Sequence, residues 1–140
     1  MEYEKLIPVA DYIPHRPPMS MVDYIVETED GKNLVLATIR PDNRFLNSEG
    51  ILDRSVIPEL VAQAAAATNS LRNNGMCRPG MLALAREVVF HNDIHANDEL
   101  VISANDESPM PGWFVLDFKI ECSNRKELCA SGEISVCLLG

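Results

Sequence analysis

The chain has 140 residues, 46% hydrophobic and 24% charged, enough to bury one apolar core but too few for two ordinary domains. We therefore expect a single domain over residues 1–140. Twenty-one acidic residues against twelve basic ones give a net charge of −9. This balance argues against a nucleic-acid-binding surface, which gains affinity from basic side chains on phosphates.

The N-terminus and the cysteines indicate a cytoplasmic protein. The opening segment MEYEKLIPVADY lacks the basic and long apolar regions of a signal peptide. No stretch approaches the roughly 20 apolar residues that cross a bilayer, so we expect no membrane contact. The cysteines (Cys77, Cys122, Cys129, Cys137) form no C-x-x-C pair, so we expect reduced thiols and no metal.

The first forty residues predict a hairpin after a proline-rich start. The prolines within Val9–Met19 leave room for a short helical turn followed by extended chain. Met21–Glu27 and Lys32–Arg40 are apolar, β-branched runs. The turn between them ends in Asp-Gly, which is typical of a β-hairpin.

One clear helix is predicted, from Val56 to about Asn73. Pro58 is tolerated because it lies in the first turn, and Asn73-Asn74-Gly75 is a typical helix stop. The segment before it, Pro41–Asp53, is polar and irregular. Four strand-like segments follow the helix: Met81–His91, Leu100–Asn105, Trp113–Cys122 and Leu128–Leu139.

The helix composition indicates how the sheet is arranged around it. From Leu60 through Ala67 no residue is charged, and Gln63 is the only polar one. A helix that is apolar all round is normally buried all round, and one helix cannot supply the crossovers of a parallel sheet. We therefore expect an α+β hotdog fold, with an antiparallel sheet of about five to six strands wrapped around one long central helix.

Glu59 is the candidate catalytic residue on this helix. It lies one turn before Gln63 on the same face, so the amide can orient the carboxylate or share hydrogen bonds with a substrate. The alternative is an ordinary first-turn acid, favoured by the helix dipole and left in solvent. A carboxylate that is partly buried beside a pocket is the usual origin of a general acid or base.

Three motifs resemble those of hotdog 3-hydroxyacyl-acyl-carrier-protein dehydratases. Tyr12–Met19 followed by Met21-Val22-Asp23 resembles the family's L-P-H-R-x-P opening, and Pro58–Ala64 resembles its central-helix E-x-M-A-Q segment. Glu87–Asp98 resembles the later E-x-x-F-x-x-x-V-x-P-G-D strand and bend. The chain is most similar to divergent, aryl-polyene-type members, which keep the opening but lose the later histidine loop.

The resemblance implies a glutamate and a histidine that act together across a dimer interface. They remove water from a 3-hydroxyacyl chain on a phosphopantetheine arm, and the family's helix glutamate corresponds to Glu59. Gln63 and Pro58 are expected to contact the substrate. The family's histidine loop corresponds to Asn47–Ser55, which contains no histidine. His15 is therefore the candidate partner of Glu59, whereas His91 and His95 are expected to be structural.

Three functions stay open from the sequence: a dehydratase, a hotdog thioesterase that uses the helix carboxylate alone, and a non-catalytic acyl-binding subunit. The expected partners are an acyl carrier protein or an acyl-coenzyme A substrate, without a separate cofactor. We expect a homodimer or a larger assembly, or a heterodimer with a homologous dehydratase. An acidic chain needs a local basic patch to dock an acidic carrier, and its candidates are Arg16, Arg40, Arg44, Arg54, Arg72 and Arg78.

Overall fold

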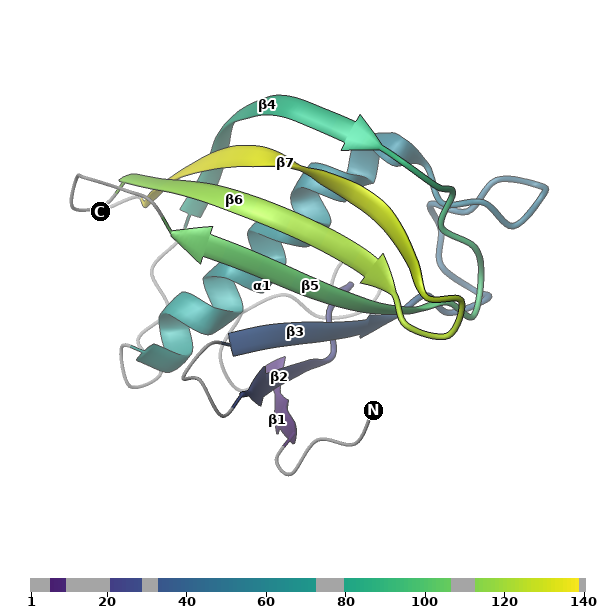
Figure 1. Cartoon of the computed structure of the whole chain (residues 1–140), viewed down its shortest axis with the longest axis horizontal. Coiled ribbons are helices and arrows are strands. Elements are labelled where there is room, and N and C mark those ends of the chain that lie inside the picture. The colour runs from purple at the N-terminus through teal and green to yellow at the C-terminus, as the bar shows by residue number, and fades with distance from the viewer. Residues whose placement is uncertain (1–5, 10–20, 29–32, 73–79, 107–112, 139–140) are drawn as a thin grey trace.

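In the described part of the chain, an antiparallel sheet of seven strands arches over one α-helix, α1 (Figure 1). The structure, a computed structural model, describes residues 6–9, 21–28, 33–72, 80–106 and 113–138. Its elements in chain order are β1 (Leu6–Pro8), β2 (Tyr24–Glu27), β3 (Asn33–Thr38), the 3₁₀ turn η2 (Arg54–Val56), α1 (Ile57–Arg72), β4 (Gly80–Phe90), β5 (Glu99–Asp106), β6 (Trp113–Cys122) and β7 (Glu127–Leu138). The strands lie in the order β1-β2-β3-β5-β6-β7-β4. These observations confirm the predicted hotdog fold, with a helix of 16 residues.

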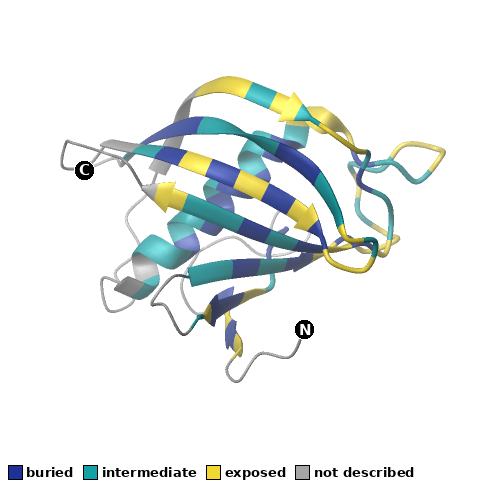
Figure 2. Cartoon of the chain, viewed as in Figure 1, coloured by how far each residue is buried: buried dark blue, intermediate teal, exposed yellow. Residues whose placement is uncertain are grey.

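One row of apolar residues crosses the concave face of the sheet. The strand register places these residues side by side on six neighbouring strands: Ile7, Ile25, Val35, Ile102, Ile120 and Ala130. All six are buried. On β6 the buried residues alternate with exposed ones, as expected for a sheet with one covered face (Figure 2). This row forms the floor against which α1 packs.

The helix buries one face against this floor and leaves another partly uncovered. Ile57, Leu60, Val61, Ala64 and Ala67 are buried in the core. Pro58, Glu59, Ala62, Ala65, Ala66 and Asn69 are partly exposed, and we call them the helix stripe. The expectation of a helix buried all round is therefore wrong within one chain, because the curved sheet covers only one side of α1.

Most predicted elements are confirmed, with shifts of a few residues at their ends. The structure adds β1, so the sheet has seven strands rather than five to six. Sequence patterns missed β1 because it is short and contains Pro8, which a strand tolerates at a sheet edge. The predicted turn at 28–31 and the helix stop at 73–75 lie wholly or mainly outside the described residues.

A buried ion pair holds the bend between β4 and β5. Asp98 is buried, and its Oδ2 accepts hydrogen bonds from Arg125 Nη2 at 2.6 Å and from the His95 N–H at 2.8 Å. Arg125 also donates to the Asp93 carbonyl at 2.9 Å. The bend in turn pairs with the segment before α1, through the bridge between Ile51 and His95. The ion pair therefore helps to fix the start of the helix.

The pairing of β4 with β7 contains a bulge that depends on a glycine. The register shifts between Arg86 and Val89, and Glu87 has a φ of 52°. A Cβ on Gly132 would lie 2.8 Å from the Val88 Cα, a backbone atom that cannot move independently. Only glycine therefore lets β7 approach the bulge this closely.

We expect Gly132→Ala to lower the free energy of unfolding by about 2 kcal/mol, because the added methyl group overpacks this crossing. Urea denaturation monitored by circular dichroism measures the change. Ser103→Ala, at a partly exposed position of β5, should change it by less than about 0.5 kcal/mol. Equal stability of Gly132→Ala and the wild type would contradict this account of the bulge.

The Asp98 ion pair predicts a pH-dependent contribution to stability. Burial alone would raise the pKa of Asp98, but the His95 N–H, Arg125 and Asn124 stabilise the carboxylate and hold its pKa below the ordinary value. This contribution is therefore present above the unfolded-state pKa of roughly 4 and is lost as the pH falls through the lower folded-state value. Asp98→Asn should be about 2 kcal/mol less stable than the wild type at pH 7.

The stability difference between the wild type and Asp98→Asn should shrink below roughly pH 4, which urea titrations at several pH values would detect. Asp93→Asn is the matched control, because Asp93 pairs with Arg54 at the exposed surface and such pairs contribute little. A difference that stays constant down to pH 2 would contradict the assignment.

Candidate functional site

Glu59 lies in the first turn of α1 and is partly exposed. The helix reaches this point through a capped start, in which the Asp53 side chain accepts a hydrogen bond from the Ser55 N–H at 2.9 Å. That hydrogen bond lowers the pKa of Asp53, so the cap is charged near neutral pH. The Ile57 N–H donates to the Arg54 carbonyl and Pro58 has no N–H, so the first turn favours negative charge chiefly through the helix dipole. A carboxylate at this position can exchange protons with a bound molecule.

The Gln63 side chain connects Glu59 to the chain before β2. Gln63 is buried, and its Oε1 accepts a hydrogen bond from the Met21 N–H at 2.8 Å. Its Nε2 donates to Glu59 Oε1 at 3.3 Å. The structure thus brings together two of the predicted site residues, and Pro58 adjoins them in the same turn.

The three histidines have different places. His15 lies outside the described residues, so its role as the partner of Glu59 stays a prediction. His91 is exposed, with Nε2 3.0 Å from Ser131 Oγ, and His95 is partly buried on the bend that Asp98 holds. The expectation that His91 and His95 are structural or exposed, rather than catalytic, stays a prediction.

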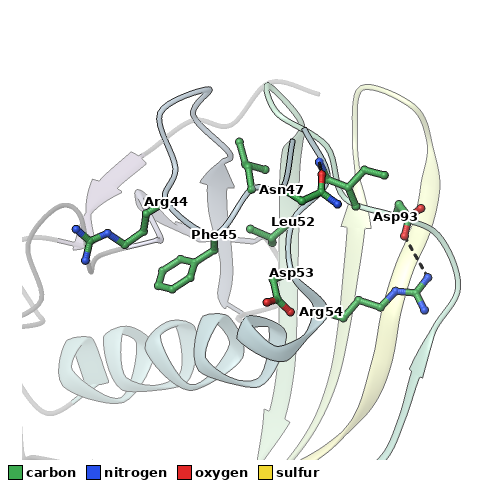
Figure 3. Close-up of a pocket in the computed structure, with 9 residues that line it drawn as sticks. Arg44, Phe45, Asn47, Leu52, Asp53, Arg54 and Asp93 are labelled. Atoms are coloured by element: carbon green, nitrogen blue, oxygen red, sulfur yellow. Dashed lines mark hydrogen bonds and ion pairs between the residues drawn. The ribbon is translucent and has the colours of Figure 1, made fainter. Parts of the chain in front are cut away.

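A concave feature lies beside the start of the helix. It is an open pocket of about 530 Å³, formed by the segment before α1 together with Asp93 (Figure 3). Its lining residues are Arg44, Phe45, Leu46, Asn47, Ile51, Leu52, Asp53, Arg54 and Asp93. Glu59 and Gln63 do not line it. The Glu59 carboxylate is therefore not part of this pocket.

The charges of this pocket are only partly balanced. Arg54 donates to Asp93 at 3.1 Å and lies 5.1 Å from the centre of the Phe90 ring. Arg44 is exposed on another side of the pocket and makes no recorded hydrogen bond or ion pair with the described residues. Sequence patterns did not reveal this pocket, because the segment has no clear periodicity and its shape arises from turns and isolated bridges.

The thiols and acids outside this region suggest no other site. Cys122, Cys129 and Cys137 are thiols rather than disulfides, and burial raises the pKa of the Cys129 thiol to about 11, which disfavours the reactive thiolate. Within the described part of the chain, no three His, Cys, Asp or Glu side chains come together as metal ligands. None of the described helices is long and apolar enough to cross a membrane.

Curated relatives of the chain are 3-hydroxyacyl-[acyl-carrier-protein] dehydratases named FabZ. The protein from Acinetobacter baumannii is 28% identical over 103 residues, which cover 69% of this chain and 70% of the relative. The protein from Ruminiclostridium cellulolyticum is 26% identical over 131 residues, or 90% of this chain and 91% of the relative.

Solved structures share the fold. The dehydratase heterocomplex ApeI:P from Xenorhabdus doucetiae matches with a TM-score of 0.82 and 21% identity, covering 97% of this chain and 93% of that chain. A 1,4-dihydroxy-2-naphthoyl-CoA thioesterase from Synechocystis matches with a TM-score of 0.61 and 12% identity, covering 76% and 81%. At these identities the matches show the hotdog fold alone.

A family model shows which protein family the chain belongs to. The family model ApeP-like, described as ApeP dehydratase, matches residues 7–138 and so includes Glu59, Gln63 and the whole described sheet except its first residue. This confirms the resemblance to the divergent dehydratase group. The chain belongs to the ApeP-like dehydratase family.

Proposed function

We propose that this chain is a dehydratase that acts on 3-hydroxyacyl thioesters carried by an acyl carrier protein, in fatty-acid or polyene-type synthesis. The observation that carries the proposal is the Glu59 carboxylate, partly exposed in the first turn of α1 and hydrogen-bonded to Gln63, in a chain of a dehydratase family. The FabZ relatives are 3-hydroxyacyl-[acyl-carrier-protein] dehydratases, which supports a carrier-bound substrate. This role places the chain in the cytoplasm.

The reaction removes a proton from the α-carbon and the hydroxyl group from the β-carbon, which gives an enoyl thioester and water. In our proposal Glu59 exchanges the proton of the hydroxyl group, and His15 takes the α-proton. A backbone N–H at the start of α1, together with the helix dipole, polarises the thioester carbonyl as negative charge develops on it. Pro58 and Gln63 border the place where the reacting atoms would lie.

Carrier docking requires positive charge on an acidic chain. Three of the six candidate arginines have described side chains, and two of them, Arg40 and Arg44, are exposed in one turn. Arg44 and Arg54 line the open pocket beside the helix start. We place the carrier at this turn, because Arg44 is a cation without a recorded partner there.

The second candidate function is a thioesterase. The observation that favours it is the segment before α1, which has no histidine at residues 47–55 and folds instead as a tight turn held by Asn47. A helix carboxylate can by itself activate water or attack a thioester carbonyl. A thioesterase from Synechocystis has the same fold, which supports this alternative.

We further propose that the working unit contains at least two chains. The helix stripe is partly uncovered, and β4 is an edge strand whose outer edge has no described neighbour. A second copy, or a homologous dehydratase as in the heterocomplex from Xenorhabdus doucetiae, would cover both. A homologue could also supply a histidine, which is how a non-catalytic subunit would function.

The assay incubates the purified chain with 3-hydroxyacyl and enoyl thioesters on carrier and on coenzyme A. We expect enoyl absorbance to change without release of free thiol. Glu59→Gln and His15→Ala should each lower the rate by about 100-fold or more, since each removes a proton-transfer group, while the melting temperature stays near that of the wild type.

Matched controls are Glu99→Gln and His91→Ala, which change exposed side chains on the sheet and should keep the wild-type rate. Thiol release that depends on Glu59 would favour the thioesterase. If neither reaction occurs, with this chain alone or with a homologous partner, both enzymatic functions are excluded. A full rate in Glu59→Gln would remove Glu59 from the site.

The assembly is tested with two exposed hydrophobic residues at opposite edges of the sheet. Val89 on β4 is 49% exposed, and Leu6 on β1 is 47% exposed. We expect Val89→Asp to weaken the dimer about tenfold or more, because it places a charge beside the paired edge, while Leu6→Asp leaves it unchanged. Analytical ultracentrifugation measures both, and a monomeric wild type, or equal effects of the two variants, would contradict pairing through β4.

A further inference from the structure

The Gln63 amide spans two parts of the chain that are distant in sequence. It is 1% exposed, and it is the one buried polar side chain among the described side chains of α1. Its two recorded hydrogen bonds reach Met21 in one direction and Glu59 in the other. A polar group buried this deeply among alanines is tolerated because it is hydrogen-bonded.

The bond to Met21 fixes which way the amide points. A backbone N–H can only donate, so the Gln63 oxygen must face Met21, and the NH₂ group must face Glu59. The 2.8 Å bond to Met21 is shorter than the 3.3 Å bond to Glu59. The shorter bond therefore anchors the amide, and the longer one presents a donor to the carboxylate.

The anchor itself is held by the sheet. Two residues after Met21, the Asp23 N–H donates to the Leu36 carbonyl of β3, and Asp23 Oδ2 accepts from the Thr38 N–H. Met21 is also buried in the core. The donor that faces Glu59 is thus fixed relative to both α1 and the sheet, whereas a glutamate side chain alone has several rotamers available.

We propose that Gln63 is a positioning residue, whose amide, anchored on the Met21 N–H, holds the Glu59 carboxylate in one orientation for proton transfer. This inference rests on the proposed function of Glu59. It assigns Gln63 a role through Glu59, and the expectation that Gln63 contacts the substrate stays a separate prediction.

The competing explanation is that Gln63 only ties the helix to the strand through Met21. Two substitutions separate the two hydrogen bonds. Gln63→Glu keeps an oxygen for the Met21 N–H but places a second carboxyl oxygen opposite Glu59. Gln63→Met keeps the length of the side chain and removes both hydrogen bonds. Thr68→Val is the control on the same helix, because the Thr68 hydroxyl contacts only the carbonyls of Ala64 and Ala65.

We expect both Gln63 variants to lower kcat by about 10- to 100-fold near neutral pH, with KM within about threefold of the wild type, because the reacting group is misoriented. As the pH falls, Gln63→Glu should recover relative to the wild type. The two adjacent carboxyl groups then share one proton, and the new carboxyl group can donate to Glu59 as the amide does. Gln63→Met should not recover, and Thr68→Val should keep the wild-type kcat.

Wild-type kcat in Gln63→Glu at neutral pH, with a loss confined to Gln63→Met, would show that only the Met21 bond matters and would overturn the proposal. So would losses in both variants that follow their melting temperatures and have the same pH dependence as the wild type.

A second measurement does not need activity and so separates this inference from the proposed function. In protein labelled with ¹³C at glutamate carboxyl groups, the Glu59 signal is assigned by its loss in Glu59→Gln. We expect Gln63→Glu to change that signal while the Met21 amide keeps its protection from hydrogen exchange. An unchanged Glu59 signal overturns the positioning role. A changed signal in a wild type that is inactive both alone and with a homologous partner refutes the dehydratase, but it still shows that Gln63 orients the Glu59 carboxylate.

Discussion

The approach of the sheet to the helix is the constraint on which the rest of this structure depends. Alanines on α1 allow the concave face to come close, and the row of buried apolar residues from Ile7 to Ala130 packs beneath them. Large side chains at Ala64 or Ala67 would hold the helix away from the sheet. The close approach places Gln63 within reach of Met21, and through Gln63 it restrains the carboxylate of Glu59.

The start of the helix is held from the other side by polar groups. Asp98 and Arg125 fix the bend after β4, and the bend pairs with the segment before α1 through Ile51 and His95. Asp53 then caps the turn that leads into the helix. The segment before α1 is thus held by hydrogen bonds at both ends, and residues 47–55 within it contain no histidine. A second proton-transfer group opposite Glu59 would therefore have to come from outside this segment.

Within one chain the sheet covers only one face of α1, and the helix stripe with Glu59 is left partly exposed. Among the described residues, the edge strand β4 has no partner on its outer side. Small residues on such a stripe leave room for a second surface close to the backbone. A site built at that boundary would combine Glu59 from one chain with groups from another, so the identity of the second chain would decide which reaction occurs.

The sequence by itself determined the type of fold, since one helix with an uncharged, alanine-rich middle at residues 60–67, followed by four strand-like segments, fits few arrangements other than a wrapped antiparallel sheet. It also identified Glu59 and Gln63 as neighbours, because helical spacing fixes that relation locally. Only the tertiary structure decided the direction of the Gln63 amide, the edge strand β1, the bulge at Gly132 and the pocket beside Arg44. Each of these depends on contacts between residues far apart in the chain, such as Met21 with Gln63 or Ile51 with His95. Local patterns carry no information about such contacts, because the folded backbone alone sets the distance between their partners.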